Sequence, residues 1–161
     1  MSSICYIALG SNLGNREGNL RQALAAIAGI KGISIERVSE FIVTAPVGGP
    51  AGQQDYYNAA ARLATELSPR ALLASLVGVE QTMGRDRKRE IRHGSRIIDL
   101  DILLFHDVIM DEPELKIPHP RMHERLFVLR PLAEIAPDAV HPGMGKTIMA
   151  LLRACPMGSC D

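Results

Sequence analysis

One segment of the chain combines strand-forming residues with two acids and reads Arg92-His93-Gly94-Ser95-Arg96-Ile97-Ile98-Asp99-Leu100-Asp101-Ile102-Leu103-Leu104-Phe105. The apolar residues around the two aspartates are mostly β-branched or leucine, which predicts a strand over Asp99–Phe105. Side chains two residues apart on a strand share a face. We therefore expect Asp99 and Asp101 to point one way and the neighbouring apolar side chains to point the other way, into a core.

The two carboxylates would repel each other at this spacing and would be costly to remove from water. They become favourable when a hard divalent cation lies between them, and Mg²⁺ prefers one or two carboxylates together with substrate phosphates. Arg96 lies just ahead of them and is well placed for a phosphate oxygen. The segment therefore indicates a magnesium and phosphate site. The alternative is a solvated edge strand whose outer face carries acids.

The sequence before these acids is strongly basic. Residues 85–96 contain six arginine or lysine residues against two acids, and Ile91 is their one apolar anchor. We expect a mobile loop in this stretch. Cations beside a carboxylate-bound metal can together hold a triphosphate. Their position favours a functional role over that of a solvated run of charge.

Length and composition limit the possible classes of protein. A chain of 161 residues, 47% of them hydrophobic, is long enough for a proper core, so we expect a single domain over residues 1–161 with a frayed tail from about residue 155. The net charge of +0 argues against a role in coating nucleic acid or a membrane surface. No apolar run approaches the ~20 residues that span a bilayer, and no signal core is evident. We expect a cytoplasmic protein in which Cys5, and Cys155 and Cys160 in a polar tail, are free thiols.

Hydrophobic periodicity and turn residues outline the other elements. We expect strands over residues 3–9, 33–43 (either regular or bulged) and 57–67, helices over residues 15–28 and 69–84, and a Gly- and Pro-rich binding loop over residues 44–55. Ser68 should cap the second helix, with Pro69 at its first position. The order β-α-β-β-α-β predicts a single-domain α+β fold of ferredoxin-like kind, with a mainly antiparallel sheet and helices packed outside.

The remainder of the chain adds smaller elements. We expect a hairpin partner of the acidic strand at residues 108–110, short helices near residues 121–126 and 131–136, and a last helix over residues 146–154. Residues 143–147 resemble the end of a Walker A loop, but Val140 stands where that motif needs glycine. We therefore interpret them as a turn into the last helix.

Two further groups of residues are candidates for ligand contacts. His119 and His123 have a spacing that could hold Zn²⁺ on one helix face, but prolines on both sides of His119 argue against a regular helix, and no third ligand has suitable spacing. Contact with phosphate is the better interpretation of His119. Tyr56, Tyr57 and Asn58 follow the Gly/Pro loop and could bind a planar ring by stacking and by hydrogen bonds to its edge. For any one aromatic residue taken alone, ordinary core packing is the better interpretation.

Five blocks of the sequence resemble, in order, those of the 6-hydroxymethyl-7,8-dihydropterin pyrophosphokinase family of the folate pathway. The blocks are residues 8–14, 55–59, 92–103, 117–122 and 125–132. The resemblance implies transfer of a pyrophosphoryl group from ATP to the hydroxymethyl oxygen of the dihydropterin, with release of AMP. It also implies two Mg²⁺ ions as cofactors, and ATP and the dihydropterin as small-molecule partners of a protein that we expect to be a monomer.

The same resemblance implies roles for individual residues. Asp99 and Asp101 would hold the metal ions. Arg85 and Arg96 would clamp phosphates and act with these aspartates in catalysis. The nucleotide side would be lined by Glu80, Arg85, Arg87, Arg96, Ile102, His119 and Arg125. The pterin pocket would be formed by Thr44, Val47, Tyr56, Asn58, His93 and Phe127.

The sequence also departs from the family's usual pattern. His93 stands where an aromatic residue, typically tryptophan, is common, in the loop expected to close over the substrates. Ala45 stands where proline is common. Two other functions compete with the pyrophosphokinase. A non-catalytic RNA-binding module of the same fold would need exposed aromatic residues on its central strands. A two-metal nuclease or a nucleotidyl-type transferase would use the same acids.

Overall fold

The computed structural model describes residues 2–46, 49–85 and 94–156 of the chain. Its framework is an antiparallel sheet in the spatial order β2 (Ile33–Val38), β4 (Tyr56–Thr65), β1 (Ser3–Ser11) and β5 (Asp99–Phe105), with β3 (Ile42–Thr44) also paired to β4. The helices α1 (Arg16–Ala28) and α2 (Pro69–Thr82) connect these strands. This order and these connections make a ferredoxin-like fold, so the predicted α+β class is confirmed.

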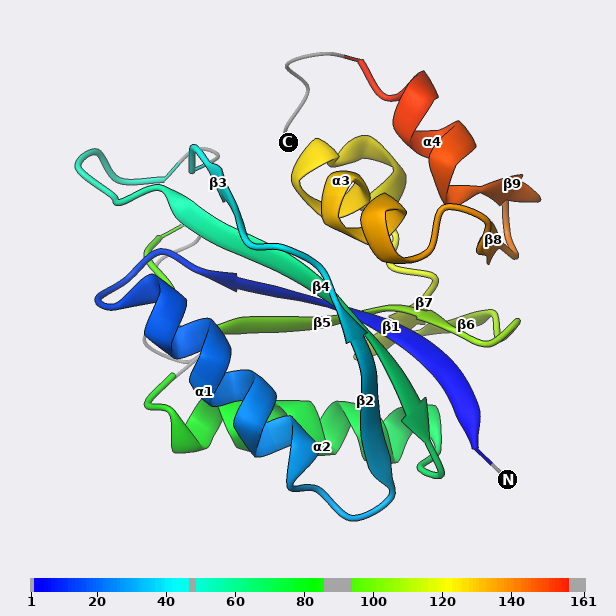
Figure 1. Cartoon of the computed structure of the whole chain (residues 1–161), viewed down its shortest axis with the longest axis horizontal. Helices are drawn as coiled ribbons and strands as arrows, with labels where there is room; N and C mark the ends of the chain where they lie inside the picture. The colour runs from blue at the N-terminus through cyan, green and yellow to red at the C-terminus, as the bar shows by residue number, and fades with distance from the viewer. Residues whose placement is uncertain (1, 47–48, 86–93, 157–161) are drawn as a thin grey trace.

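The chain after β5 adds a second, smaller layer. It consists of the hairpin β6 (Met110–Glu112) and β7 (Leu115–Ile117), a 3₁₀ turn (Met122–Glu124), α3 (Leu126–Ile135), the hairpin β8 (Val140–His141) and β9 (Lys146–Thr147), and α4 (Ile148–Ala154). Figure 1 shows α1 and α2 side by side on one face of the sheet, and α3 with α4 on the opposite face. The helices therefore pack outside the sheet, as expected.

Each face of the sheet carries its own apolar core. One core joins the sheet to α1 and α2 through buried residues such as Leu20, Leu72 and Leu76. The other joins the sheet to α3 and α4 through Leu129 and Ile148. Successive side chains of a strand point to opposite faces, so the central strands supply both cores.

The two long helices begin where the sequence predicts. The Ser68 hydroxyl accepts a hydrogen bond from the main-chain N–H of Ala71 at 3.2 Å, and Pro69 follows at the first helical position. At the start of α1, Oδ1 of Asn15 accepts from the N–H of Gly18 at 3.0 Å. These side chains satisfy main-chain donors that have no partner within the helix.

The predicted single strand over residues 33–43 is wrong in one respect, because it is divided into β2 and β3. The interruption lies at Ser39, which is buried beside β4. The Ser39 hydroxyl accepts from the N–H of Ala60 at 2.9 Å, and the Ser39 N–H donates to the Ala60 carbonyl at 2.9 Å. The Ser39 hydroxyl thus takes the place of a main-chain carbonyl as the acceptor for Ala60. Regular pairing with β4 resumes only at Ile42.

The predicted pairing of residues 108–110 with the acidic strand is also wrong. β6 pairs with β7 instead, with Met110 opposite Ile117. Leu115 and Ile117 are both buried in the core that α2 covers, and β7 lies beside β5. Burial of these two side chains therefore places β7, and not residues 108–110, next to the acidic strand.

The helices near the C-terminal end differ in their bounds from the prediction. α3 runs through Pro131, although proline cannot donate the hydrogen bond that would reach the Phe127 carbonyl. Burial of Leu129 and Leu132 on the sheet side of α3 offsets this loss. α4 begins at Ile148, where the Thr147 hydroxyl caps it by accepting from the Ala150 N–H at 3.1 Å.

The cysteines lie in different surroundings from those expected. Cys155 is buried against the core between α3 and α4, so the sequence before residue 156 is not a polar tail. Burial also raises the pKa of the Cys5 thiol to about 12. Cys160 lies outside the described residues. Within the described part of the chain, no helix combines the length and the apolar character needed to cross a membrane.

Candidate active site

A cavity of about 370 Å³ lies on the α3 side of the sheet, next to the ends of β1, β4 and β5. Its charged side is formed by Arg96, Asp99, Asp101, His119, Arg121 and Arg125. Its neutral side includes Gly10, Thr44, Tyr56, Asn58 and Phe127. A volume of this size is within the range of small-molecule sites. The cavity therefore brings together residues from five separate parts of the sequence.

The two acids line this cavity together from β5, while Leu100 between them is buried in the opposite core. The alternation predicted from the sequence is thereby confirmed. The neighbouring strand β1 places Gly10 opposite Asp99 and Ala8 opposite Asp101. Because these neighbours have little or no side chain, the space in front of the carboxylates stays open.

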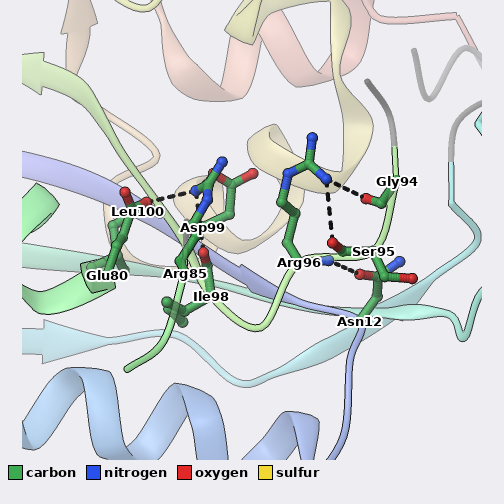
Figure 2. Close-up of polar contacts among 9 residues, drawn as sticks. All are labelled: Asn12, Glu80, Arg85, Gly94, Ser95, Arg96, Ile98, Asp99 and Leu100. Carbon is green, nitrogen blue, oxygen red and sulfur yellow. Dashed lines mark hydrogen bonds and ion pairs between the residues drawn. The ribbon is translucent and has the colours of Figure 1, made fainter. Parts of the chain in front are cut away.

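A buried ion-pair network supports the acidic strand from the α2 side. A guanidinium N–H of Arg85 donates to Oε2 of Glu80 at 2.8 Å and to Oδ1 of Asp99 at 2.7 Å. The same nitrogen is 3.1 Å from the Ile98 carbonyl, and Oε2 of Glu80 also accepts from the N–H of Leu100 at 2.8 Å (Figure 2). The Glu80 and Arg85 side chains are 2% and 6% exposed. They hold both the main chain of β5 and the carboxylate of Asp99.

The position of this network bears on the sequence interpretation. Glu80 and Arg85 were both expected to line the nucleotide side, but neither is among the described residues that line the cavity. Ile102 was expected there too, yet its side chain packs in the core covered by α1 and α2. The reason is strand alternation, because the neighbouring side chains of Asp101 and Ile102 point to opposite faces of the sheet. Any contact of Ile102 with a ligand in the cavity would have to come from its main chain.

Arg96 lines the cavity, and its main chain is tied to the end of β1. Its guanidinium donates to the carbonyls of Gly94 at 2.9 Å and Ser95 at 3.2 Å (Figure 2). Its main-chain N–H donates to Oδ1 of Asn12 at 2.7 Å, and its carbonyl accepts from the Asn12 N–H at 3.0 Å. The sequence interpretation gave no role to Asn12.

His119 lines the cavity beside β5, where its main-chain N–H donates to the Leu103 carbonyl at 3.0 Å, and its side chain is held as a neutral ring. Burial, together with the positive charge of Arg125, lowers the pKa of His119 to about 4. The Arg121 N–H donates to Nδ1 of His119 at 3.2 Å, a bond that requires this nitrogen to be unprotonated. His119 therefore offers an uncharged side chain to a ligand at neutral pH.

Arg125 is a partly buried cation next to His119. Burial and the nearby charge of Arg121 lower its pKa, although Asp101 and Asp99 act in the opposite direction. Its Nε is buried and has no hydrogen-bond partner among the described residues. A buried N–H donor without a partner is costly. Arg125 therefore has an unused donor at a site where an anion would satisfy it.

The neutral side of the cavity presents an aromatic ring, an amide and a hydroxyl. Nδ2 of Asn58 donates to the Thr44 hydroxyl at 2.6 Å. A Cβ atom at Gly10 would lie 3.0 Å from Oδ1 of Asn58, so any other residue there would require the Asn58 side chain to shift, whereas the 3.5 Å to the Tyr56 ring would be an ordinary contact. Phe127 completes this side. The arrangement can hold a flat heterocycle by its faces and its polar edge.

Tyr57 does not join this group. It packs against the opposite core, and the guanidinium of Arg16 lies 4.6 Å from its ring centroid. Strand alternation separates it from Tyr56, since neighbouring side chains point to opposite faces. Val47, Arg87 and His93, which were also expected at the site, lie outside the described residues.

Three residues near the cavity were missed by the sequence interpretation. Arg121 follows the predicted His119 contact by two positions, and its charge next to an expected phosphate ligand was an available signal. Gly10 could have been found from the Gly-rich turn that follows the first strand. Asn12 carried no signal, because its partners are about 40 and 80 residues away in the sequence.

The oxygen donors of this site fit a hard cation. Within the described residues, no cluster of three or more histidine, cysteine, aspartate or glutamate side chains could hold a metal ion. Two carboxylates that face an open space are nevertheless the usual protein contribution to a Mg²⁺ site in which phosphate and water oxygens complete the coordination. Asp99 and Asp101 thus fit Mg²⁺ in the presence of a phosphate ligand.

Comparison with known proteins identifies the relatives of this chain. Residues 6–137 match the family model for 7,8-dihydro-6-hydroxymethylpterin-pyrophosphokinase (HPPK). The 2-amino-4-hydroxy-6-hydroxymethyldihydropteridine pyrophosphokinase of Bacillus subtilis is 47% identical over 135 residues, which cover 84% of this chain and 79% of the relative. The protein of the same name from Pseudomonas aeruginosa is 42% identical over 151 residues, covering 94% and 91%.

Solved structures share the fold at much lower sequence identity. An HPPK-DHPS crystal structure in complex with substrates has a TM-score of 0.74 at 14% identity and is matched by 96% of this chain. A Plasmodium falciparum HPPK-DHPS structure with STZ-DHP has a TM-score of 0.73 at 15% identity. The chain spans 43% and 45% of the length of these two solved chains, so they support the fold of one part of each. On the family match and the closely related sequences, the chain belongs to the 7,8-dihydro-6-hydroxymethylpterin-pyrophosphokinase family.

Proposed function

We propose that the cavity is the place where this pyrophosphokinase transfers a pyrophosphoryl group from ATP to 6-hydroxymethyl-7,8-dihydropterin, a step of folate biosynthesis that yields AMP and the diphosphate ester. Family membership supports the reaction and ATP as co-substrate. The observation that carries the location is the joint lining of one cavity by two acids, several cations and a ring-binding group.

Binding of two Mg²⁺ ions is assigned to the carboxylates of Asp99 and Asp101. Their carboxylates face the same open space beside Gly10 and Ala8, which supports this assignment. Mg²⁺ bound there would supply charge neutralisation for the phosphates and a lower pKa for the attacking hydroxyl. The residues of the chain provide the geometry in which these effects act.

Binding of the triphosphate is assigned to four side chains of the charged side, those of Arg96, Arg121, Arg125 and His119. The unpartnered Nε of Arg125 supports a direct contact with an anion, and neutral His119 can donate from its other ring nitrogen. A side-chain rotation would let Arg96 exchange its hydrogen bonds to the Gly94 and Ser95 carbonyls for bonds to phosphate oxygens. Arg87, as implied by the family resemblance, remains a prediction for the same role.

Arg85 is assigned two successive roles, which modifies the direct phosphate clamp expected from the sequence. In the structure it neutralises Asp99 through a 2.7 Å hydrogen bond and is itself fixed by Glu80. When metal ions neutralise Asp99, Arg85 can turn its charge toward the phosphates. Glu80 then acts by positioning Arg85 and β5, without contact with substrate.

The dihydropterin is assigned the neutral side of the cavity. Tyr56 and Phe127 would contact the faces of the bicycle, while Asn58 and Thr44 would bond its edge. Val47 and His93 are proposed for the same pocket from the family resemblance alone. Asn58 presents one acceptor and one donor, and Thr44 can rotate its hydroxyl, so the pair can match an amide-like ring edge.

The reaction proposed for this geometry is an in-line displacement at the β-phosphorus. The hydroxymethyl oxygen forms the new bond to the β-phosphorus as the bond from that atom to the oxygen of AMP breaks. Rate enhancement comes mainly from alignment of the two substrates and from fixed charges around the transferred group. Asp99 is the proposed acceptor of the hydroxyl proton.

The direct test is incubation of the protein with MgATP and 6-hydroxymethyl-7,8-dihydropterin. AMP and the dihydropterin diphosphate should appear in equal amounts, and no AMP should form when the dihydropterin is omitted. ATP conversion to ADP, or cleavage of DNA under the same conditions, would contradict the proposal and favour a different phosphoryl-transfer enzyme. Retention on an RNA column would support the RNA-binding alternative.

We also propose that the enzyme acts as a monomer in the cytoplasm. Cys5 is a free thiol in the structure, which suits a reducing compartment. Sedimentation equilibrium at micromolar concentration should give a mass near 17.5 kDa, and a dimer mass would contradict the first part of this proposal.

A further inference from the structure

We infer that Asn12 is a positioning residue that couples the loop containing Gln53 and Gln54 to the placement of Arg96. The inference rests on the function proposed above, because it concerns how the charged and neutral sides of that site are held in position relative to each other. Asn12 lies at the C-terminal end of β1 and its side chain is fully buried. It is not among the residues that line the cavity.

On one side, Asn12 fixes the main chain of Arg96 by two hydrogen bonds. The Arg96 N–H donates to Oδ1 of Asn12 at 2.7 Å, and the Asn12 N–H donates to the Arg96 carbonyl at 3.0 Å (Figure 2). These two bonds determine where the Arg96 side chain leaves the main chain. The position of its guanidinium in the cavity therefore depends on Asn12.

On the other side, the amide nitrogen of Asn12 holds the loop that precedes β4. Nδ2 of Asn12 donates to Oε1 of Gln53 at 3.0 Å and to the Gln54 carbonyl at 3.3 Å. Gln53 is oriented in turn, because its own Nε2 donates to the Pro50 carbonyl at 3.0 Å. The turn between Pro50 and Gln53 has Gly52 at a φ of 83°, a conformation that glycine adopts without strain.

The chemistry of these partners requires an amide at position 12. The Arg96 N–H can only donate, so Oδ1 must face it, and Nδ2 is then directed at two acceptors. Aspartate could accept from Arg96 but could not donate to the loop, and an apolar residue could do neither. Asn12 is itself held in place, since Nδ2 of Asn19 on α1 donates to the Ser11 hydroxyl at 3.1 Å and to the Leu13 carbonyl at 2.8 Å.

The consequence is a link between the two halves of the site. Gln53 and Gln54 lie directly before Tyr56 and Asn58, which form the neutral side, while Arg96 belongs to the charged side. The buried amide of Asn12 is hydrogen-bonded to both. A displacement of the loop that contains Gln53 and Gln54 would therefore shift the Asn12 side chain and, with it, the main chain of Arg96. Gln53 should therefore affect the use of ATP although it does not touch the phosphate-binding residues.

The test compares two neighbouring variants of the loop. Gln53→Ala removes the side-chain acceptor of Asn12, whereas Gln54→Ala keeps its contact, which comes from the main-chain carbonyl. Gln53→Ala should lower kcat/KM for ATP about fivefold, the effect of one neutral hydrogen bond. Gln54→Ala should change it by less than about twofold, as expected of a surface substitution.

A double-mutant cycle separates coupling from a general effect on folding. In an Arg96→Lys background, the loss caused by Gln53→Ala should shrink to below about twofold, because the group that it positions is already altered. Asn12→Asp should reproduce the Gln53→Ala loss, and adding Gln53→Ala to it should cost nothing more. The Gln53 and Arg96 variants test the inference even if a buried carboxylate at position 12 prevents folding.

Three results would overturn the inference. They are unchanged ATP kinetics in Gln53→Ala, equal losses in the two loop variants, and losses of Gln53→Ala and Arg96→Lys that multiply. The failure of the proposed function would look different, since the unmodified protein would then form no AMP with the dihydropterin. The thermal stability of both loop variants is measured in parallel, so that a loss of folded protein is not mistaken for a loss of catalytic efficiency.

Discussion

The charged and neutral sides of the cavity are held by different kinds of interaction. On the charged side, Asp99 is fixed by Arg85, which is fixed by Glu80, so its position depends on ion pairs buried behind the sheet. On the neutral side, Asn58 and Tyr56 lie where β4 places them, against the bare main chain of Gly10. The ion pairs of the charged side can exchange partners when metal ions or phosphates bind. The packing of the neutral side cannot change unless β4 moves.

This contrast matches the needs of the two proposed ligands. A metal-bound triphosphate brings charge that must replace existing pairs, so residues with alternative partners are useful there. A flat uncharged ring needs a surface of constant shape, which packing provides. The predictions below test this division, first on the charged side and then on the neutral side.

The largest effect is expected from loss of an acid. Asp101→Ala should reduce AMP formation by about 10³-fold, on the order of 4 kcal/mol, because one of the two proposed metal ligands is gone. Release of AMP from MgATP in the presence of the dihydropterin is the measurement. Asp111→Ala, at an exposed acid on β6, serves as the matched control and should retain full activity. Near-normal turnover of the Asp101 variant would show the metal assignment to be wrong.

Loss of the buried network should reduce stability more than loss of a surface ion pair. Glu80→Ala removes one partner of Arg85 in the interior, a change that costs on the order of 3 kcal/mol and lowers Tm by roughly 10 °C. Glu17→Ala breaks the exposed pair with Arg21 and should cost less than about 0.5 kcal/mol. Thermal unfolding measures both. Equal shifts in the two variants would contradict a supporting role for Glu80.

The neutral state of His119 predicts a pH dependence of stability. Its pKa of about 4 in the folded protein lies below the ordinary 6.5, so the unfolded chain binds more protons between these values. The stability that His119 contributes is complete above pH 6.5 and is lost as pH falls toward 4, by an amount on the order of 2–3 kcal/mol.

Denaturant unfolding of the ligand-free protein and of His119→Asn at several pH values isolates this contribution. Other titrating groups are common to both proteins, so they cancel in the difference. The difference in unfolding free energy should change steadily between pH 6.5 and pH 4. Parallel curves for the two proteins would mean that His119 is not held neutral.

The smallest effect is expected on the neutral side. In Gly10→Ala the new Cβ would lie 3.0 Å from Oδ1 of Asn58, and that side chain would have to shift. KM for the dihydropterin should rise by about fivefold, equivalent to one weakened hydrogen bond, with KM for ATP nearly unchanged. Gly78→Ala on α2, where no atom lies within 4 Å of the new Cβ, is the matched control. A larger change in KM for ATP than in KM for the dihydropterin would show that Asn58 does not belong to the dihydropterin side of the site.

The sequence predicted the parts of the site that depend on local pattern. The alternation of Asp99, Leu100 and Asp101 determined that the two acids share a face, and this was confirmed. The predicted cap at Ser68 was equally local, since the donor that it satisfies lies three residues away. Periodicity also led to the correct fold class, because the order of strands and helices restricts the topology to few solutions.

Local pattern could not place the residues whose neighbours come from a distant part of the chain. Tyr56 and Tyr57 are equivalent in the sequence, and only the core covered by α1 and α2 determines that Tyr57 faces away from the cavity. Arg85 and Glu80 were expected on the nucleotide side, and only the tertiary structure shows that they form an interior network with Asp99. Asn12 gave no signal at all, because its role depends on Gln53 and Arg96 being brought to either end of one amide.

Local order along the chain thus established which side chains share a face, where the helices begin and which family the blocks resemble. Packing of the helices on the sheet then established which face is closed by a core and which is left open to ligands. The reason is that hydrophobic alternation specifies two faces without saying what covers each, whereas burial and long-range hydrogen bonds exist only after the strands and helices have met.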